Sequence, residues 1–416
     1  MTGLANSKIL GTCLQMCSEK ETKLRVKNKI IHPLEKSLGK NIGKEYVLIK
    51  SFSRSAAGNT SCCDPKEIRP PYICRRTTNY LVKNVLISDE KSRPQLRLDW
   101  TTYHFVFDRL RALRQDMIVQ KCDLLGAVCD HDEIVIHTHI LQVCVKFHLL
   151  ANYLFSQNKQ SGSSKDGPNL KATHQFDQHI NFSHLLECLK MILNYYEILF
   201  PRNCDSGLEF KNTHFVKTKD TKNVINETRI DMIVVYILLN IGSYHSYKWG
   251  IELDDKLKNN HKVKRALRMN RLYVERNYVG LFKEVKNLSL IHLLAFHWSL
   301  PSIFKEMLAV MSAAHSSKNC KFPLQHFAKI LFLVEANKEE LINYLKESGI
   351  KIHSASTNDM HDPKTQNKSL NDIFICFDKN SFNASASVKW QELPDIDKQL
   401  NQCDLLTMLL DYDLNC

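Results

Sequence analysis

The chain has 416 residues, of which 44% are hydrophobic, and it contains only 13 glycines and 11 prolines. This length allows two or three domains with buried cores, and the composition argues against a long disordered or β-rich chain. The formal net charge is +13, and residues 1–97 carry 19 Lys and Arg against 8 Asp and Glu. A basic surface of this kind attracts nucleic acid, acidic proteins or anionic lipid, although it can also serve solubility alone.

No segment of the sequence predicts export or insertion into a membrane. The first ten residues contain no apolar stretch of the kind found in signal peptides. The longest apolar run, Met232 to Leu239, is far shorter than the roughly 20 residues that a spanning helix needs. We therefore expect an intracellular protein without a membrane anchor, whose 14 cysteines are reduced.

Residues 1–97 are basic, lack a sustained helical period and are interrupted by glycines and prolines. We expect an extended arm with short helices, one of them running from Glu19 to His32 and stopped by Pro33. Pro70 and Pro71 predict an extended segment, since each ring fixes its own φ and disfavours helix in the residue before it. Such an arm wraps over a partner or over its own domain.

From Leu98 onward the sequence pattern is that of amphipathic helices. In the first helix, apolar residues recur at three- and four-residue spacing on one face: Tyr103, Val106, Phe107, Leu110, Leu113 and Met117. Further helices are predicted over Glu133–Phe155, Phe182–Phe200, Asn226–Tyr244, Lys262–Leu288 and Leu290–His315. Pro301 is expected near a helix start. Successive helices without strand signals predict an α-solenoid or a helical bundle over residues 98–315.

Residues 316–390 read as helix, helix, strand, loop and strand, which is the order of a winged helix. The first helix covers Phe322–Leu331, and the second begins with the capping pattern of Asn337 and Glu340 and ends at Gly349. The strands follow at residues 350–352 and 372–377. A winged helix binds DNA, RNA or proteins, so this fold does not decide the function. Residues 391–416 form an acidic and apolar tail, either a short docking helix or a packed end.

Five sequence blocks occur in order along the chain. They are Gly11-Thr-Cys-x-x-Met-Cys17 followed by Glu19, His32-Pro-Leu-Glu35, Ile49-Lys-x-Phe-x-Arg-Ser-Ala-Ala57, Glu67-Ile-Arg-Pro-Pro71 with Thr78-Asn-Tyr-Leu81, and Asp108-Arg-x-Arg-Ala-x-Arg-Gln-Asp116. Together they resemble the SAC/GANP family from about Gly11 to about Phe377. Ser18 stands where the family often has proline, and Leu110 stands where threonine is common. One block alone would be weakly specific, whereas five in the family's order are specific.

The resemblance implies a mainly α protein: a helical-repeat, PCI-like domain followed by a C-terminal winged helix and preceded by an extended basic N-terminal arm. It also implies a scaffold without enzymatic activity. The partners it implies are a second PCI-type subunit, a small acidic peptide and single-stranded RNA.

Among the family, the chain most resembles the short members with a SAC-homology domain, which are associated with centrosome duplication and spindle formation. We therefore expect a scaffold in centrosome duplication, spindle assembly and mitotic progression, located at the centrosome, the spindle and in the cytoplasm. The alternative is an RNA-binding scaffold subunit of a nuclear, transcription-coupled mRNA-export complex.

Neither a catalytic site nor a metal site is predicted. Cys13 and Cys17 have the spacing of a zinc-binding pair, but Cys62, Cys63 and Cys74 do not form a matching second pair. The patterns G-x-x-x-x-G-K-S/T, G-x-S-x-G and G-x-G-x-x-G are absent from the sequence. We expect no catalytic residue, no bound metal or cofactor and no small-molecule substrate.

Arg109, Arg111 and Arg114 follow Asp108 on the polar face of the first long helix. One interpretation is pairing within the helix, for instance of Asp108 with Arg111, which is worth roughly a few tenths of a kcal/mol. We favour the interpretation that the arginines hold the arm against the helical domain, because a guanidinium binds carboxylates or carbonyls in a fixed geometry. The arm residues of this predicted docking site come from the family blocks: Cys13, Met16, Cys17, Arg69, Pro70 and Pro71.

The candidates for nucleic-acid binding lie mainly on the helix predicted over Lys262–Leu288. They are Lys262, Lys264, Arg265, Arg268 and Arg271, with basic residues of the arm as a second set: Lys23, Arg25, Lys27, Lys29, Arg75 and Arg76. Phosphate contacts by such residues would make binding steeply dependent on salt. The alternative is a solvated helix face without a ligand.

Overall fold

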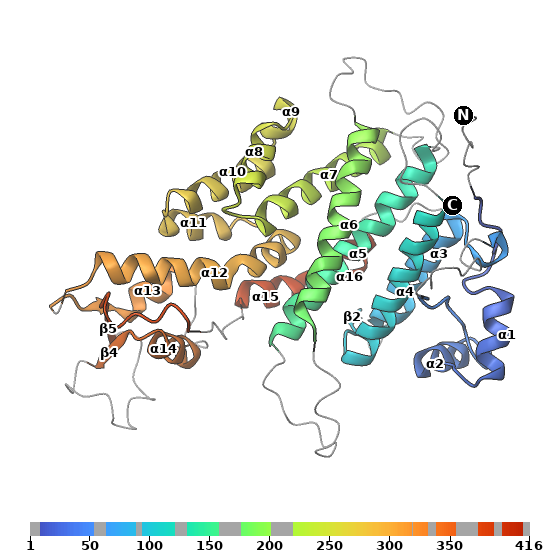
Figure 1. The fold of residues 1–416 in the computed structure, drawn as a ribbon, viewed down its shortest axis with the longest axis horizontal. Helices are drawn as coiled ribbons and strands as arrows, with labels where there is room; N and C mark the ends of the chain where they lie inside the picture. Colours follow the sequence, from blue (N-terminus) through green and yellow to red (C-terminus); the bar gives the residue numbers. More distant parts are fainter. Residues whose placement is uncertain are drawn as a thin grey trace, which may run out of the picture. The chain divides into compact units, whose positions relative to one another are not determined.

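The structure, a computed structural model, describes residues 9–53, 64–88, 94–120, 131–157, 176–200, 219–317, 319–331, 338–354, 373–386 and 393–410. Over these residues the chain is mainly helical, with helices α1 to α16 and only short strands (Figure 1). The predicted fold class is therefore confirmed at the level of a mainly α protein. By its internal contacts the chain divides into two compact units.

The first unit comprises Met1–Ala151, Gly167–Met232 and Cys403–Cys416, and it begins with the predicted arm. The arm contains α1 (Glu19–Lys27), α2 (Pro33–Asn41) and α3 (Pro71–Leu81). Between and after them lie the 3-10 helix η2 (Pro65–Glu67), the π-helical segment η3 (Val82–Leu86) and the antiparallel strands β1 (Ile87–Ser88) and β2 (Gln95–Leu96). The arm is thus more helical than the sequence predicted.

Two prolines of the arm begin helices, contrary to the prediction. Pro33 opens α2 instead of stopping a helix that reaches His32, and Pro71 opens α3 instead of continuing an extended segment. Both occupy the first helical position, where the missing N–H costs no helical hydrogen bond and the fixed φ suits the helix. Pro70 alone is extended, with φ −62° and ψ 160°.

Long helices form the rest of the first unit: α4 (Trp100–Val119), α5 (His131–Gln157) as far as Ala151, α6 (Gln178–Leu199), the start of α7 (Lys219–Leu239), and α16 (Leu405–Leu410). Asp99 caps α4 by accepting from the N–H of Thr102 at 2.7 Å, and Asp177 caps α6 by accepting from Ile180 at 2.9 Å. Within the described residues, one helix segment, Asp132–Phe155 of α5, is long and apolar enough to cross a membrane. Its most apolar stretch is fully buried inside the protein, as core helices are.

The second unit comprises Asn152–Asp166 and Ile233–Gln402. It contains the end of α7, then α8 (Tyr244–Ile251), α9 (Asp255–Lys258), α10 (His261–Val274), α11 (Tyr278–Val285) and α12 (Leu290–Ala314). The single helix predicted over 262–288 is therefore two helices. Pro301 lies inside α12 and not near a helix start, so that expectation was wrong as well.

The break between α10 and α11 is a Schellman motif built without glycine. Arg276 has a positive φ of 57°, its N–H donates to the Tyr273 carbonyl at 2.9 Å, and Asn277 N–H donates to the Leu272 carbonyl at 2.8 Å. Left-handed backbone is the conformation in which glycine is usual and arginine is not. A search of the sequence for glycine or proline therefore misses this helix end.

The C-terminal part of the second unit is a small α/β layer. β3 (Phe322–Pro323), α13 (Leu324–Ile330), α14 (Lys338–Glu347), β4 (Lys351–Ser354) and β5 (Ile373–Cys376) follow one another. The sheet has the order β3-β5-β4 with antiparallel pairing, so the last strand lies in the middle. The predicted helix end at Gly349 is confirmed by its φ of +76°, whereas the predicted cap at Asn337 lies outside the described residues. Strand β3 was not predicted.

The described part of the C-terminal tail is packed and helical. α15 (Pro394–Gln402) lies against α12, and α16 lies against η3. Tyr153 Oη donates to Asp397 Oδ1 at 2.8 Å and lies 3.3 Å from the Leu393 carbonyl oxygen. Of the two interpretations of the tail, the packed end describes residues 393–410. The boundaries predicted at residues 97, 315 and 390 stay predictions.

Candidate functional site

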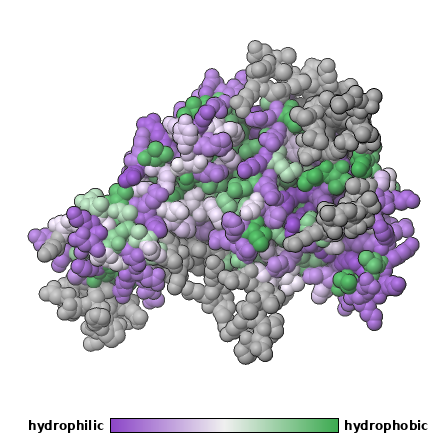
Figure 2. Space-filling model, in the orientation of Figure 1, coloured by the Kyte–Doolittle hydropathy of each residue, from purple (hydrophilic) through white to green (hydrophobic). Residues whose placement is uncertain are grey.

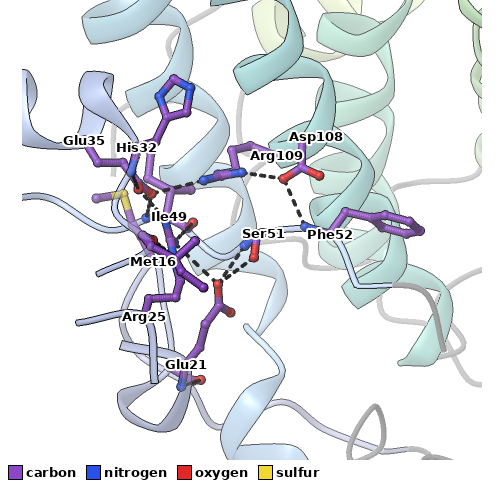
Figure 3. Close-up of polar contacts among 12 residues, drawn as sticks. Met16, Glu21, Arg25, His32, Glu35, Ile49, Ser51, Phe52, Asp108 and Arg109 are labelled. Carbon is purple, nitrogen blue, oxygen red and sulfur yellow. Dashed lines mark hydrogen bonds and ion pairs between the residues drawn. The ribbon is translucent and has the colours of Figure 1, made fainter. Parts of the chain in front are cut away.

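Glu35 is the first centre of a buried charge network that joins the N-terminal arm to α4 (Figure 3). Its carboxylate is fully buried and accepts hydrogen bonds from the guanidinium of Arg25 on α1 and from Arg109 Nη2 on α4, the latter at 3.2 Å. It also accepts from the backbone N–H groups of His32 and Ile49, each at 3.1 Å. One carboxylate thus holds α1, α2, the chain at residue 49 and α4 together.

The arm continues along α4 through Phe52 and Ser53. Asp108 Oδ2 accepts from the N–H of Phe52 at 3.1 Å, and the Arg111 guanidinium lies 3.9 Å from the centre of the Phe52 ring. Gln115 Nε2 donates to the Ser53 carbonyl at 3.0 Å. The three α4 residues are spaced by three and four positions and therefore lie on one face of the helix. This face of α4 is the track on which the arm lies.

Asp116, one residue beyond this track, is the second centre of the network. Its carboxylate is 1% exposed and accepts from Arg69 Nε at 2.6 Å and from Lys50 Nζ. Arg69 is fully buried, and its Nη1 lies 3.4 Å from the Met16 carbonyl. Lys50 Nζ also donates to the Glu67 carbonyl at 2.7 Å. Buried charges are tolerated when they are paired in this way, and removal of one partner leaves the other uncompensated.

The first family block runs beside the fourth, so that distant segments of the arm pair through their backbones. Thr12 N–H donates to the Pro65 carbonyl at 2.7 Å, and Cys13 N–H donates to the Ile68 carbonyl at 3.0 Å. Gly11 N–H donates to Gln120 Oε1 at 3.0 Å. A Cβ at Gly11 would lie 2.5 Å from the carbonyl oxygen of Ile68, so the close approach requires glycine there.

The described cysteines of the arm are packed in the interior, whereas Cys62 and Cys63 lie outside the described residues. Cys13, Cys17 and Cys74 are buried, and burial raises the pKa of the Cys17 and Cys74 thiols to about 12. A metal or a nucleophilic reaction needs the thiolate, which is disfavoured at such sites. Among the residues that the structure describes, no group of three or more His, Cys, Asp or Glu side chains is placed to hold a metal ion.

The structure divides the predicted arginine cluster. Arg109 and Arg111 contact the arm as described above, but Arg114 does not. Its Nη1 lies 3.2 Å from Glu187 Oε2 and 3.3 Å from Cys188 Sγ, so it joins α4 to α6. Asp108 pairs with its neighbour Arg109, and the Arg111 guanidinium lies over the Phe52 ring. The described contacts of Arg114 are therefore with α6, and those of Arg109 and Arg111 are with the arm.

Sequence reasoning missed the two acids on which the network depends, Glu35 and Asp116. Both lie inside the family blocks, and each is the acid at the last position of its block. Two arginines of the arm offered for nucleic acid are also structural. Arg25 and Arg75 are each 7% exposed, and Arg25 is held by Glu35 and by the Ile49 carbonyl at 3.1 Å. They are not available to a phosphate.

The basic residues predicted for nucleic-acid binding lie on α10, and three of them have acidic partners. Arg268 Nε lies 3.2 Å from Glu284, Arg265 Nε lies 3.8 Å from the same carboxylate, and Arg271 Nε lies 2.7 Å from Glu275. Lys264 is exposed and Lys262 is half-buried. Side chains of Arg268 and Arg271 stay about two-thirds exposed, at 67% and 68%, and exposed ion pairs of this kind are weak.

Sequence comparison matches residues 16–354 to the SAC3/GANP family. This range holds both centres of the network and the α4 track. The chain belongs to the SAC3/GANP family. Within the family it is 24% identical over 332 residues to SAC3 family protein 1 of Schizosaccharomyces pombe, covering 77% of this chain and 28% of that protein. It is also 24% identical over 404 residues to Protein xmas of Drosophila melanogaster, covering 94% of this chain and 17% of that protein. The chain thus spans less than a third of either relative.

The charge network of Glu35 and Asp116 is suited to holding the arm in place on α4. The acids of the network are saturated by arginine, lysine and backbone donors, and the thiols beside them are protonated. A SAC3/GANP arm fixed on α4 in this way forms one surface with the helices below it, and membership of the family indicates a scaffold role.

Proposed function

We propose that this chain is a non-enzymatic SAC3/GANP scaffold that acts in centrosome duplication, spindle assembly and mitotic progression, at the centrosome, the spindle and in the cytoplasm. The observation that carries the scaffold part is the arm docked by the Glu35 and Asp116 centres, within the range matched to the family. The rigid docking supports a role in presenting a fixed surface to protein partners. The assignment to the spindle rests on the resemblance to the short members of the family.

The proposal includes a PCI-like helical domain over residues 98–315 and a winged helix over residues 316–390. The support for the winged helix is the succession β3, α13, α14, β4 and β5 with the last strand central in the sheet. The support for the helical domain is the run of helices from α4 to α12. Protein partners belong to the same proposal, whereas a second PCI-type subunit together with a small acidic peptide is expected of the alternative function that follows.

The alternative function is an RNA-binding scaffold in a nuclear mRNA-export complex, and the exposed guanidinium groups of α10 favour it. It is tested by titrating poly-uridine RNA with the purified chain and with the variant Arg268→Glu/Arg271→Glu at low and physiological salt. The alternative predicts binding that weakens with salt and with the substitutions. Affinity that is independent of salt, or equal in the two proteins, argues against it. Lys20→Glu on the arm is the matched control for a change of charge.

The deciding experiment purifies the endogenously tagged protein and compares nuclease-treated with untreated samples by mass spectrometry. The proposed function predicts centrosomal and tubulin-associated proteins in both samples. Recovery of a second PCI subunit with a small acidic peptide and mRNA-binding proteins that nuclease removes would favour export instead. Recovery of no partner in either sample would remove the scaffold proposal itself.

A further inference from the structure

Helix α8 exposes a row of large side chains. Tyr244, Tyr247 and Ile251 recur at positions i, i+3 and i+7 of one helix face and are 80%, 36% and 52% exposed. Lys248 lies on the same face and is also exposed. A surface helix ordinarily turns such residues inward and its polar residues outward. In α8, Trp249 follows this rule and packs on Tyr236, whereas the row of Tyr244, Tyr247 and Ile251 does not.

The opposite face of α8 packs against α10. The side chains of the row are therefore exposed on a helix that is held in place. Ser246 and Gly250 are buried. A Cβ at Gly250 would lie 2.5 Å from Leu267 Cδ2, so glycine allows the two helices to approach closely. Just before α8, the N–H of Gly242 donates to Asn270 Oδ1 of α10 at 2.7 Å.

Helix α10 extends the exposed face of α8. Helix α10 packs against α8, and the Arg271 side chain on α10 is 68% exposed. Val274, one turn beyond Arg271, is 59% exposed. Tyrosine and arginine are the residues that most often dominate the affinity of protein interfaces, and exposed aliphatic side chains beside them add apolar area. We call Tyr244, Tyr247, Ile251, Arg271 and Val274 the α8 face.

The surroundings of the α8 face are basic. Residues 244–286 contain 11 Lys and Arg against 5 Asp and Glu, a formal net charge of +6. In the view of Figure 2 the surface over α8–α11 is mainly hydrophilic, with small hydrophobic patches among the polar residues. A partner that covers an apolar row inside a basic rim must bring an apolar stripe and acidic flanks.

We propose that the α8 face docks an acidic amphipathic helix of a partner protein. This deepens the scaffold role and rests on it. Single-stranded RNA can stack its bases on the tyrosines but has no aliphatic stripe to cover Ile251 and Val274, so it fits the face less well. A helix with leucine-type residues at i, i+3 and i+7 covers the same row by ridge packing.

The first test places the photo-crosslinker p-benzoylphenylalanine at Tyr244 in the full chain in cells. The matched control carries the crosslinker at Ile180 of α6, which is 49% exposed. The expected result is a crosslink from position 244 to an acidic segment with helical apolar spacing, which does not form from position 180. Crosslinks to RNA, to basic or uncharged segments, or to nothing would overturn the proposal.

The second test measures affinity for the crosslinked segment, made as a synthetic peptide. Ile251→Glu and Arg271→Glu are each expected to weaken binding at least about tenfold, as losses at the centre of an interface do, while Ile180→Glu leaves it unchanged. Affinities of Ile251→Glu and Arg271→Glu equal to that of the unchanged chain would contradict the proposed site. Circular dichroism and the melting temperature verify that each exposed-site variant is folded. If the endogenous chain that carries Ile251→Glu still recovers its partners, the α8 face is not their docking site, although the scaffold function stands.

Discussion

At the scale of single residues, Asp116 is one of the two buried carboxylates on which cations converge. It faces Arg69 and Lys50, whose side chains are 0% and 14% exposed, and among the described residues it is the carboxylate that pairs with Arg69. We predict that Asp116→Asn, which keeps the shape and removes the charge, lowers the free energy of unfolding by roughly 3–5 kcal/mol. Urea denaturation measures this loss.

The control for Asp116 is an ion pair of the same arm that lies at the surface. Lys20→Ala removes the exposed contact of Lys20 with Glu67, and no change of melting temperature is expected. Similar losses in Asp116→Asn and Lys20→Ala would mean that burial of the charges does not set the strength of the network.

His148 gives the molecule a defined response to acid. Burial lowers the pKa of its imidazole to about 3, and Asn181 Oδ1 lies 2.7 Å from its Nδ1, so the neutral ring donates there. Between this pKa and the ordinary value of about 6.5, the unfolded chain binds a proton that the folded chain does not. Stability is therefore complete above about pH 6.5 and falls as the pH drops, by about 1.4 kcal/mol per pH unit for this group.

We predict that His148→Gln reduces this loss of stability at acid pH. Glutamine keeps a hydrogen-bond donor, in its amide group, but cannot titrate. The measurement is the free energy of unfolding at pH 7.5 and pH 5.0 for both proteins. Burial also lowers the pKa values of His32 and His184, so some loss of stability will remain in the variant. Parallel losses in the two proteins would show that His148 is protonated without cost.

At the scale of elements, the end of α10 carries backbone strain. Arg276 occupies the left-handed position of the Schellman motif, where a side chain costs about 1 kcal/mol relative to glycine. Arg276→Gly is expected to raise the free energy of unfolding by about that amount. Arg276→Ala is the matched control, because it removes the side-chain charge but keeps the strain. If the two substitutions act alike, the charge and not the backbone is responsible.

The α4 track is the element-scale feature that carries the arm. Arg111→Glu removes the guanidinium over Phe52 and places a negative charge next to the backbone that Asp108 holds. We predict faster amide exchange at Phe52 and Ser53 and a lower melting temperature, with a loss of about 1 kcal/mol or more. Arg111→Lys keeps the charge but not the planar group, so its melting temperature should lie between those of the wild type and of Arg111→Glu. Unchanged exchange at Phe52 would count against the docking role of Arg111.

Element type was predictable wherever an apolar period was long and unbroken. The helix predicted over 133–155 is α5, His131–Gln157, and the one predicted over 182–200 is α6, Gln178–Leu199. Prediction failed at element ends, where Arg276 makes a turn that glycine usually makes and Pro33 opens a helix instead of closing one. Local sequence gives only a conformational preference at a helix end, and tertiary contacts around the turn can override it.

The candidate site was predictable only in part for a related reason. Arginines in a block rich in charged residues indicate an ionic contact, but the pattern does not identify the acidic partner. Arg109 reaches Glu35 across 74 positions and Arg69 reaches Asp116 across 47. No local period encodes such a pairing, whereas Arg114, in the same pattern, turns to α6. The family blocks identified the segments, and only the fold could assign the partners.

At the scale of the whole molecule, the arm is part of the fold and not an appendage. We predict that a chain lacking residues 1–63 loses soluble yield and cooperative unfolding, because Arg109 and Asp116 are then buried without Glu35 and Lys50. Size-exclusion chromatography and thermal circular dichroism measure both losses. Supplying residues 1–63 as a separate chain should restore them in part. A shortened chain that is monomeric and melts sharply would contradict this view of the arm.

The docking of the arm also sets an order of events during synthesis. The ribosome makes Glu35 and Arg69 first, but their partners on α4 come later: Arg109 is 74 residues behind Glu35, and Asp116 is 47 residues behind Arg69. Until α4 has left the exit tunnel, the nascent arm holds charges and apolar residues that it cannot yet bury. Domains generally fold as they emerge from the N-terminus, but here the first segment translated has to wait for a later one. We expect the nascent arm to be prone to aggregation during that interval.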